Sequence, residues 1–135
     1  MCQVAQEYIA QGEVTAQVDT AAVDMFRQAW PRDYDAHFFS NVWHDWEPAT
    51  CAFLARQSFE ALPSGGRICL HEMLLNDDGA GPLTPVSFSM LMLLGTQGQQ
   101  FTLPELRDIL EGAGFVDVRA QHTYGYYSLV QATKL

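Results

Sequence analysis

Residues 62–72 read LPSGGRICLHE, and this stretch carries the change from a helix to a buried strand. The proline and the two glycines at 63–66 interrupt a helix, because proline lacks an amide proton and glycine stabilises helices poorly. The run Ile68-Cys69-Leu70 is short, apolar and bounded by turn residues, which is typical of a strand buried on both faces. Upstream, apolar or small side chains recur at helical spacing on one face: Cys51, Leu54, Ala55, Ser58 and Leu62. The stretch therefore predicts a helix over 48–62 and a strand over 67–72.

Helices and strands alternate along the rest of the chain. The spacing of apolar residues predicts helices over 4–9, ending at Gly12, and over 85–94. Thr102 followed by Glu105 forms a capping box, which predicts a further helix that ends at Gly114. Residues 14–23 are expected to form a turn and then a short strand that ends near Asp24. Strands are also expected over 34–40, 116–118 and 127–132, and the last two are expected to pair antiparallel. This order is typical of an α/β fold.

The composition is that of a single folded domain that carries little charge. The 135 residues are 48% hydrophobic and only 17% are charged, against about 25% in typical soluble domains. So little charge suggests that some apolar surface is covered by something outside this chain. The formal net charge of -9 argues against binding to nucleic acid, which needs a basic surface, and against docking on an anionic membrane.

The sequence predicts no membrane anchor, no secretion signal and no metal site. No apolar run approaches the roughly 18 residues of a membrane span, and the first residues lack the basic and apolar regions of a secretion signal. Three scattered cysteines, Cys2, Cys51 and Cys69, match no zinc or disulfide spacing. The histidines show no metal-ligand spacing either. We therefore expect reduced thiols, a cytoplasmic protein and no bound metal.

Three polar clusters stand at the ends of predicted strands. They are Asp24-Met25-Phe26, the segment Ser40–Trp46, and His71-Glu72. In α/β sheets the chemistry lies beyond the carboxyl ends of the strands. The sequence therefore predicts that these clusters converge on one edge of the sheet.

The stretch FFSNVWHDW at residues 38–46 resembles the class I S-adenosylmethionine (SAM)-dependent O-methyltransferases that act on small molecules. Plant phenol methylators and bacterial polyketide-tailoring enzymes are of this kind. Further segments follow in the family's order: Asp24-Met25-Phe26, Leu62–Arg67, Glu72-Met73, Gly112–Phe115 and Gly125–Tyr127. The resemblance covers essentially the whole chain and implies a Rossmann-like α/β sheet with an antiparallel C-terminal strand pair.

The chain resembles only the later half of the family's pattern. No Gly-x-Gly-x-Gly turn occurs in it. The family's N-terminal helical dimerisation domain, its first two strands and the acid that holds the cofactor ribose have no counterpart either. The resemblance implies that residues 1–135 are the C-terminal part of a catalytic domain with an incomplete sheet.

The resemblance assigns the reaction to two residues. His44 is the expected general base, and Glu72 the carboxylate that orients it. A neutral imidazole suits proton abstraction near pH 7. Asp45 and Met90 are expected to contact the acceptor, and Gln100 stands where the family often has a second acid. From the residues alone, a loop histidine stacked on a neighbouring tryptophan is the simpler interpretation of His44.

The same resemblance implies SAM as the cofactor. Asp24, Met25 and Phe26 resemble the segment that binds adenine, with the acid near the exocyclic amine and the apolar pair beside the ring. Ser40 and Trp46 are expected to contact the cofactor as well. A turn acid followed by core residues is an equally simple interpretation of 24–26, and Trp46 is also a candidate core residue.

The expected partners are a small aromatic or polyketide metabolite with a free hydroxyl, and a second protein chain. Without the family's first two strands, the strand at 34–40 becomes an unpaired edge. We therefore expect a second copy or a complementary methyltransferase chain to accompany this one. Two alternatives to an enzyme segment stay open: a catalytically incomplete subunit that pairs with a fuller relative, and a methyltransferase fold used for another reaction.

Overall fold

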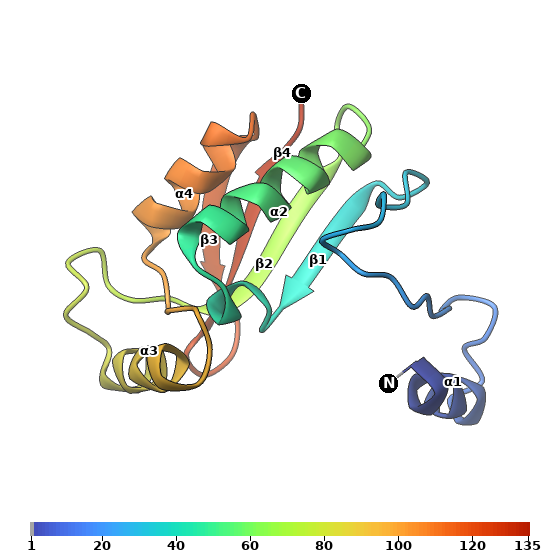
Figure 1. Cartoon of the computed structure of the whole chain (residues 1–135), viewed down its shortest axis with the longest axis horizontal. Coiled ribbons are helices and arrows are strands. Elements are labelled where there is room, and N and C mark those ends of the chain that lie inside the picture. The colour runs from blue at the N-terminus through green and yellow to red at the C-terminus, as the bar shows by residue number, and fades with distance from the viewer. Residues whose placement is uncertain (1) are drawn as a thin grey trace.

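The computed structural model describes residues 2–135. In chain order the elements are α1 (Cys2–Gln11), β1 (Ala36–Ser40), the single-turn helix η1 (Trp43–Asp45), α2 (Pro48–Ala61), β2 (Arg67–Met73), α3 (Leu83–Gly95), α4 (Leu103–Gly112), β3 (Val116–His122) and β4 (Tyr127–Thr133). Figure 1 shows one sheet with helices packed against it. The predicted α/β fold is confirmed.

The four strands form one sheet in the order β1-β2-β4-β3. β1 runs parallel to β2, with Phe39 opposite Leu70, whereas β4 pairs antiparallel with both β2 and β3. The predicted antiparallel pair is therefore confirmed. β1 stands at one edge of the sheet, as expected for the strand over 34–40.

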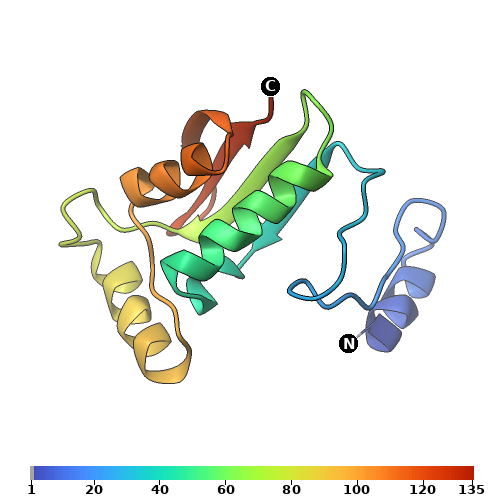
Figure 2. The same cartoon turned by 45° about the horizontal axis from the view of Figure 1, so that its top comes forward.

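α2 and α4 lie side by side on the same face of the sheet (Figures 1 and 2). Between them and the strands lies the core, which includes Leu54 of α2, Leu70 of β2 and Leu106 of α4, all without solvent exposure. Burial of such a side chain stabilises the fold by about 1.5–3 kcal/mol. This layer holds β2 rigidly and thereby fixes the position of the residues at its carboxyl end.

The predicted capping box begins α4. The Thr102 hydroxyl accepts a hydrogen bond from the Glu105 amide at 3.3 Å, and Glu105 Oε2 accepts one from the Thr102 amide at 2.8 Å. Two amide groups at the helix start are satisfied in this way. The cap also places the preceding segment beside β2, because the amide of Leu75 donates to the carbonyl of Phe101 at 2.9 Å.

The short strand predicted within residues 14–23, after a turn and ending near Asp24, is wrong. Residues 12–35 form turns and irregular connections, and the amide of Val18 donates to the carbonyl of Val14 at 3.0 Å in a single turn. The side chains of Val18 and Val23 are 46% and 44% exposed. A strand exists through hydrogen bonds to a neighbouring strand, and none of the described residues pairs with the outer edge of β1.

Two elements differ in extent or setting from the others. β3 continues to His122, beyond the predicted 116–118, and contains an irregularity in pairing at Asp117, whose φ is 56°. α1 has no buried residue and stands apart from the sheet in both views (Figures 1 and 2). No helix within residues 2–135 is both long and apolar enough to cross a lipid bilayer.

Candidate active site

Glu72 and His44 meet beyond the carboxyl end of β2. Glu72 is the penultimate residue of β2, and His44 is the middle residue of η1, which is separated from the end of β1 by two residues. The distance from His44 Nδ1 to Glu72 Oε2 is 2.6 Å, and the two residues are 5% and 2% exposed. An ionised carboxylate only accepts hydrogen bonds, so Nδ1–H is the donor. In the neutral ring this leaves the lone pair of Nε2 free to take up a proton.

Backbone amides hold the other carboxylate oxygen. The N–H groups of Val42 and Trp43 both donate to Glu72 Oε1 at 3.0 Å. Both oxygens of Glu72 therefore accept hydrogen bonds, which offsets the cost of burying the charge. Glu72 is thus held in one orientation toward His44.

Three neighbouring influences act on the pKa of His44. Burial disfavours the charged ring and acts to lower the pKa, but the hydrogen bond and negative charge of Glu72, together with the charge of Asp45, outweigh it. The pKa of His44 is therefore raised above its ordinary value of 6.5. The carboxylates favour the imidazolium, which is the form that a base acquires when it takes up a proton.

α3 closes the other side of the His44 ring. The ring of Phe88 stands edge-on to it, with centroids 5.3 Å apart and planes at 81°. Asp45 Oδ1 lies 3.6 Å from His44 Nε2. Met90 is 56% exposed, and the α3 side chain in aromatic contact with His44 is Phe88. The structure thus brings together His44, Glu72 and Asp45, but not Met90.

Gln100 lies in the segment that returns from α3 toward α4. Gln100 is 1% exposed, and its backbone N–H donates to the Ser89 hydroxyl at 3.0 Å. Within residues 2–135 neither polar atom of its side-chain amide has a hydrogen-bond partner. The backbone of Gln100 is thus bound to the residue after Phe88, which contacts His44. A neutral side chain stands at the position where the resemblance implies a second acid.

Aromatic residues form the second part of the candidate site. The Phe26 ring lies 4.9 Å from the ring of Trp46 and 6.3 Å from that of Phe53. Phe26 and Phe53 also line an open cavity of about 330 Å³ with Ala49 and Thr50. The structure therefore joins two predicted cofactor residues, Phe26 and Trp46, although no strand precedes Phe26.

The remaining predicted cofactor residues flank this aromatic group or lie apart from it. Asp24 Oδ1 accepts a hydrogen bond from the Phe26 amide at 2.9 Å, and Asp24 Oδ2 lies 3.7 Å from Arg27 Nε. Met25 packs partly buried against the core. The hydroxyl of Ser40 instead lies 3.2 Å from Nδ1 of a histidine, His71.

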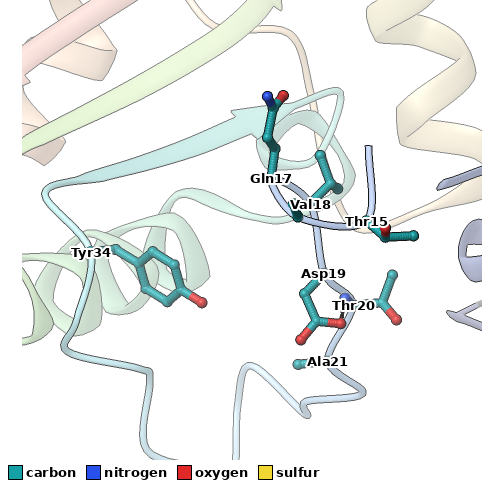
Figure 3. A pocket seen from close by; sticks show the side chains of 8 residues that line it. Thr15, Gln17, Val18, Asp19, Thr20, Ala21 and Tyr34 are labelled. Atoms are coloured by element: carbon teal, nitrogen blue, oxygen red, sulfur yellow. Dashed lines mark hydrogen bonds between the residues drawn. The ribbon is translucent and has the colours of Figure 1, made fainter. Parts of the chain in front are cut away.

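A separate cavity of about 410 Å³ lies between residues 15–21 and Tyr34. Figure 3 shows the Tyr34 ring facing this segment, with Asp19 and Thr20 across from it. None of the predicted site residues lines it. Within the described part of the chain, no three His, Cys, Asp or Glu side chains gather closely enough to hold a metal ion.

Sequence reasoning missed three contributors to the site. The amides of Val42 and Trp43 bind Glu72 through backbone groups that every sequence contains, so no residue type signals them. Gly98 packs so closely on the turn that a Cβ there would lie 2.5 Å from the carbonyl carbon of Asp45 and from the amide of Trp46. A glycine in a polar loop was the only sign of this contact, and that sign is not specific.

Comparison with known proteins places this geometry in context. Residues 1–116 match the family model described as O-methyltransferase domain. Over 119 residues the chain is 39% identical to 3-hydroxy-5-methyl-1-naphthoate 3-O-methyltransferase of Streptomyces sahachiroi, an alignment that covers 88% of this chain and 34% of the relative.

Two solved structures share the fold. Human N-acetylserotonin methyltransferase in complex with SAM has a TM-score of 0.85 and 32% identity, over 88% of this chain and 34% of that one. An O-methyltransferase family 2 protein of Planctomyces limnophilus in complex with apigenin has a TM-score of 0.93 and 32% identity, over 98% and 40%. The α/β sheet thus matches class I methyltransferase structures, and the chain spans about a third of the length of the curated relative it matches.

Proposed function

The chain belongs to the O-methyltransferase family, and on that premise we propose that it supplies the general base of a SAM-dependent O-methyltransferase. The reaction would transfer a methyl group to a hydroxyl of a small aromatic or polyketide metabolite. The observation that carries this proposal is the buried hydrogen bond of 2.6 Å between His44 Nδ1 and Glu72 Oε2. Because Nδ1–H is bound to Glu72, Nε2 is left as the base, and the Glu72 carboxylate stabilises the positive charge that forms on the ring.

His44 takes the hydroxyl proton at Nε2 as the acceptor oxygen bonds to the methyl carbon. Glu72 accepts from Nδ1–H throughout, so that the imidazolium forms beside a fixed negative charge. The amides of Val42 and Trp43 hold Glu72 in place during this change. General-base catalysis of this type contributes about 10²–10⁴-fold to rate.

The aromatic residues fit the adenine part of SAM. Phe26 lines an open, mostly apolar cavity with Phe53, and the Trp46 ring lies beside the Phe26 ring. A flat ring can pack against aromatic side chains in such a place. Asp24 is adjacent and suits the exocyclic amine, while Met25 and Ser40 complete the proposed set. When bound, SAM supplies a methyl group on a positively charged sulfur that keeps the bonding electron pair.

The proposed acceptor is a phenolic hydroxyl on a fused aromatic ring system. The names of the relatives specify a hydroxynaphthoate and N-acetylserotonin. α3 contains no charged residue and places Phe88 beside His44, which suits an aromatic acceptor. Asp45, whose Oδ1 lies 3.6 Å from His44 Nε2, and Met90, which is exposed on α3, are the proposed acceptor contacts.

Replacement of the base tests the proposal. His44→Ala in the complete active assembly is expected to lower kcat about 10²-fold or more, because the hydroxyl keeps its proton. The measurement follows radiolabelled methyl transfer from SAM to a hydroxynaphthoate acceptor. His122→Ala serves as the matched control, since this histidine is exposed on β3. Equal turnover in both variants would remove His44 from the reaction.

A pairing subunit is the second candidate function, and it is favoured by the outer edge of β1, which pairs with no other strand within residues 2–135. In that case a fuller relative or a second copy supplies the remaining strands. Calorimetry with S-adenosylhomocysteine separates the candidates, because micromolar binding by the chain alone supports the enzyme and excludes a purely structural role.

The free thiols Cys2, Cys51 and Cys69 are compatible with the cytoplasmic location that we propose.

A further inference from the structure

Asn41 stands between β1 and the turn that carries His44, and its backbone is left-handed, with a φ of 54°. This conformation is uncommon outside glycine, and asparagine is among the side chains that tolerate it best. The next two amides, those of Val42 and Trp43, are the ones that donate to Glu72 Oε1. Successive N–H groups in such turns form concavities that bind anions. The left-handed residue therefore directs both amides toward the carboxylate.

Hydrogen bonds from two strands hold Asn41 in this conformation. Its N–H donates to the carbonyl of His71 at 3.2 Å, and its Oδ1 accepts from the Tyr127 hydroxyl at 3.0 Å. The Tyr127 ring is in turn stacked on the His71 ring, with centroids 4.9 Å apart and planes at 18°. His71 precedes Glu72 in β2, so its side chain points to the opposite face of the sheet. His71 and Tyr127 thus hold the turn at Asn41, and the His71 side chain lies on the opposite face of the sheet from Glu72.

We infer that Asn41 is a positioning residue: its left-handed backbone, held by the Tyr127 hydroxyl, aims two amides at Glu72 and so sets the carboxylate that binds His44. Asn41 acts through Glu72 and touches no reacting atom. The catalytic meaning of this role rests on the proposed function. The geometry itself is measurable without methyl transfer.

The His44 ring reports on this geometry because few charges face it. Glu72 approaches from β2 and Asp45 from η1, whereas α3 contributes the uncharged Phe88. On α2, burial and the nearby charge of Glu72 raise the pKa of Cys51 to about 12, so its thiol stays neutral. A change in the pKa of His44 therefore measures a change in the two carboxylates.

Two substitutions of Asn41 test the inference in the 135-residue chain. A β-branched side chain disfavours the left-handed region, so in Asn41→Val the two amides no longer hold Glu72 against the His44 ring, and the pKa of His44 is expected to fall. The downfield NMR resonance of the Nδ1 proton, typical of a short hydrogen bond, is expected to disappear. Glycine adopts this conformation readily but has no side chain to accept from the Tyr127 hydroxyl, so Asn41→Gly is expected to lower the pKa of His44 less than Asn41→Val does and to keep the Nδ1 resonance. NMR titration of His44 measures both effects.

A second pair of variants separates positioning from folding. Tyr127→Phe removes only the hydroxyl that binds Asn41 and is expected to shift the pKa of His44 in the same direction by a smaller amount. Tyr124→Phe is the matched control, because Tyr124 lies in the same turn region with its side chain 87% exposed. The amide spectrum of β2 and β4 confirms that each variant is folded.

The outcomes are decisive in either direction. An unchanged pKa of His44 in folded Asn41→Val overturns the inference, and if that variant does not fold, an unchanged value in Tyr127→Phe overturns it. A pKa that falls more in Asn41→Val than in Asn41→Gly supports it, and an equal fall in the two variants contradicts it. None of these readouts uses SAM or an acceptor. The role of Asn41 can therefore be shown even if methyl transfer is not, and methyl transfer can be shown even if Asn41 has no such role.

Discussion

Glu72 remains stable in the interior because each of its oxygens accepts a hydrogen bond. Two backbone amides bind Oε1 and His44 binds Oε2. A buried carboxylate without such partners costs several kcal/mol. The same contacts that allow the charge to be buried also orient it toward one ring nitrogen of His44.

Glu72→Gln tests this pairing through the dependence of stability on pH. Without the carboxylate, burial dominates and the pKa of His44 falls below 6.5 instead of lying above it. A raised pKa in the folded state stabilises below the unfolded value, and this contribution is lost as the pH rises through the folded pKa. The destabilisation caused by Glu72→Gln is therefore expected to be larger at about pH 5.5 than at about pH 8.

Urea unfolding of both proteins at the two pH values measures this difference. It is expected to amount to about 1.4 kcal/mol for each unit by which the folded-state pKa of His44 differs between the proteins. Burial lowers the pKa of His37, but His37 is present in both proteins and its contribution cancels. A destabilisation that is equal at both pH values would show that Glu72 does not raise the pKa of His44.

The segment between α3 and α4 supports η1 from behind. The amide of Gln97 donates to the carbonyl of Asp45 at 3.3 Å, and Gly98 packs directly on the backbone of the same turn. α3 itself buries only Pro85 among its residues. The return segment therefore contacts the backbone of the turn that carries His44, while α3 contacts the His44 ring through Phe88.

Gly98→Ala is expected to destabilise the fold by about 1–3 kcal/mol, because the added methyl group overlaps the carbonyl oxygen of His44. Gly95→Ala is the matched control, since a Cβ at Gly95 meets no atom within 4 Å. Thermal and urea unfolding of both variants measure the effect. If the two variants unfold alike, the close packing on η1 contributes nothing to stability.

At the scale of the whole molecule, no helix of the described residues packs on the face of the sheet opposite to α2 and α4, and the outer edge of β1 is open within the same residues. α2 and α4 occupy the same face (Figure 2), and β1 has no neighbour on its outer side within the described residues. Phe38 of this strand is 64% exposed, and Leu93 and Leu94 of α3 are 67% and 81% exposed. Exposed apolar surface of this kind marks sites of protein contact or of aggregation. It agrees with the low proportion of charged residues.

We expect the isolated chain to self-associate through β1. Phe38→Lys should shift it toward the monomer, because a charged side chain on an edge strand opposes strand-to-strand pairing. Size-exclusion chromatography with light scattering over a range of concentrations measures the mass. Tyr124→Lys replaces an exposed aromatic residue away from this edge and serves as the control. A wild-type chain that is monomeric at every concentration would contradict the expectation.

Local signals were sufficient to predict most of the elements. α4 begins at a capping box formed by Thr102 and Glu105, and α2 ends before the proline and glycines at 63–66. These signals act between residues a few positions apart, so the sequence itself contains them. The apolar run at 68–70 likewise predicted the strand that carries Glu72. The motif at 38–46 then indicated which histidine belongs beside that carboxylate.

Pairing and close approach were decided only by the tertiary structure. The segment 14–23 has residues suited to a strand but no partner strand, and strand formation depends on a partner that its own sequence does not supply. The turn at Asn41 and Val42 is bound to Glu72 and Tyr127, which lie 30 and 86 positions away from the residues that they contact. Gly98 likewise packs on η1, which is distant from it in the sequence. The sequence alone determined which chemical groups are present and which helices and strands carry most of them. Their distances and burial, and hence the pKa of His44, follow from contacts that form only when the sheet assembles.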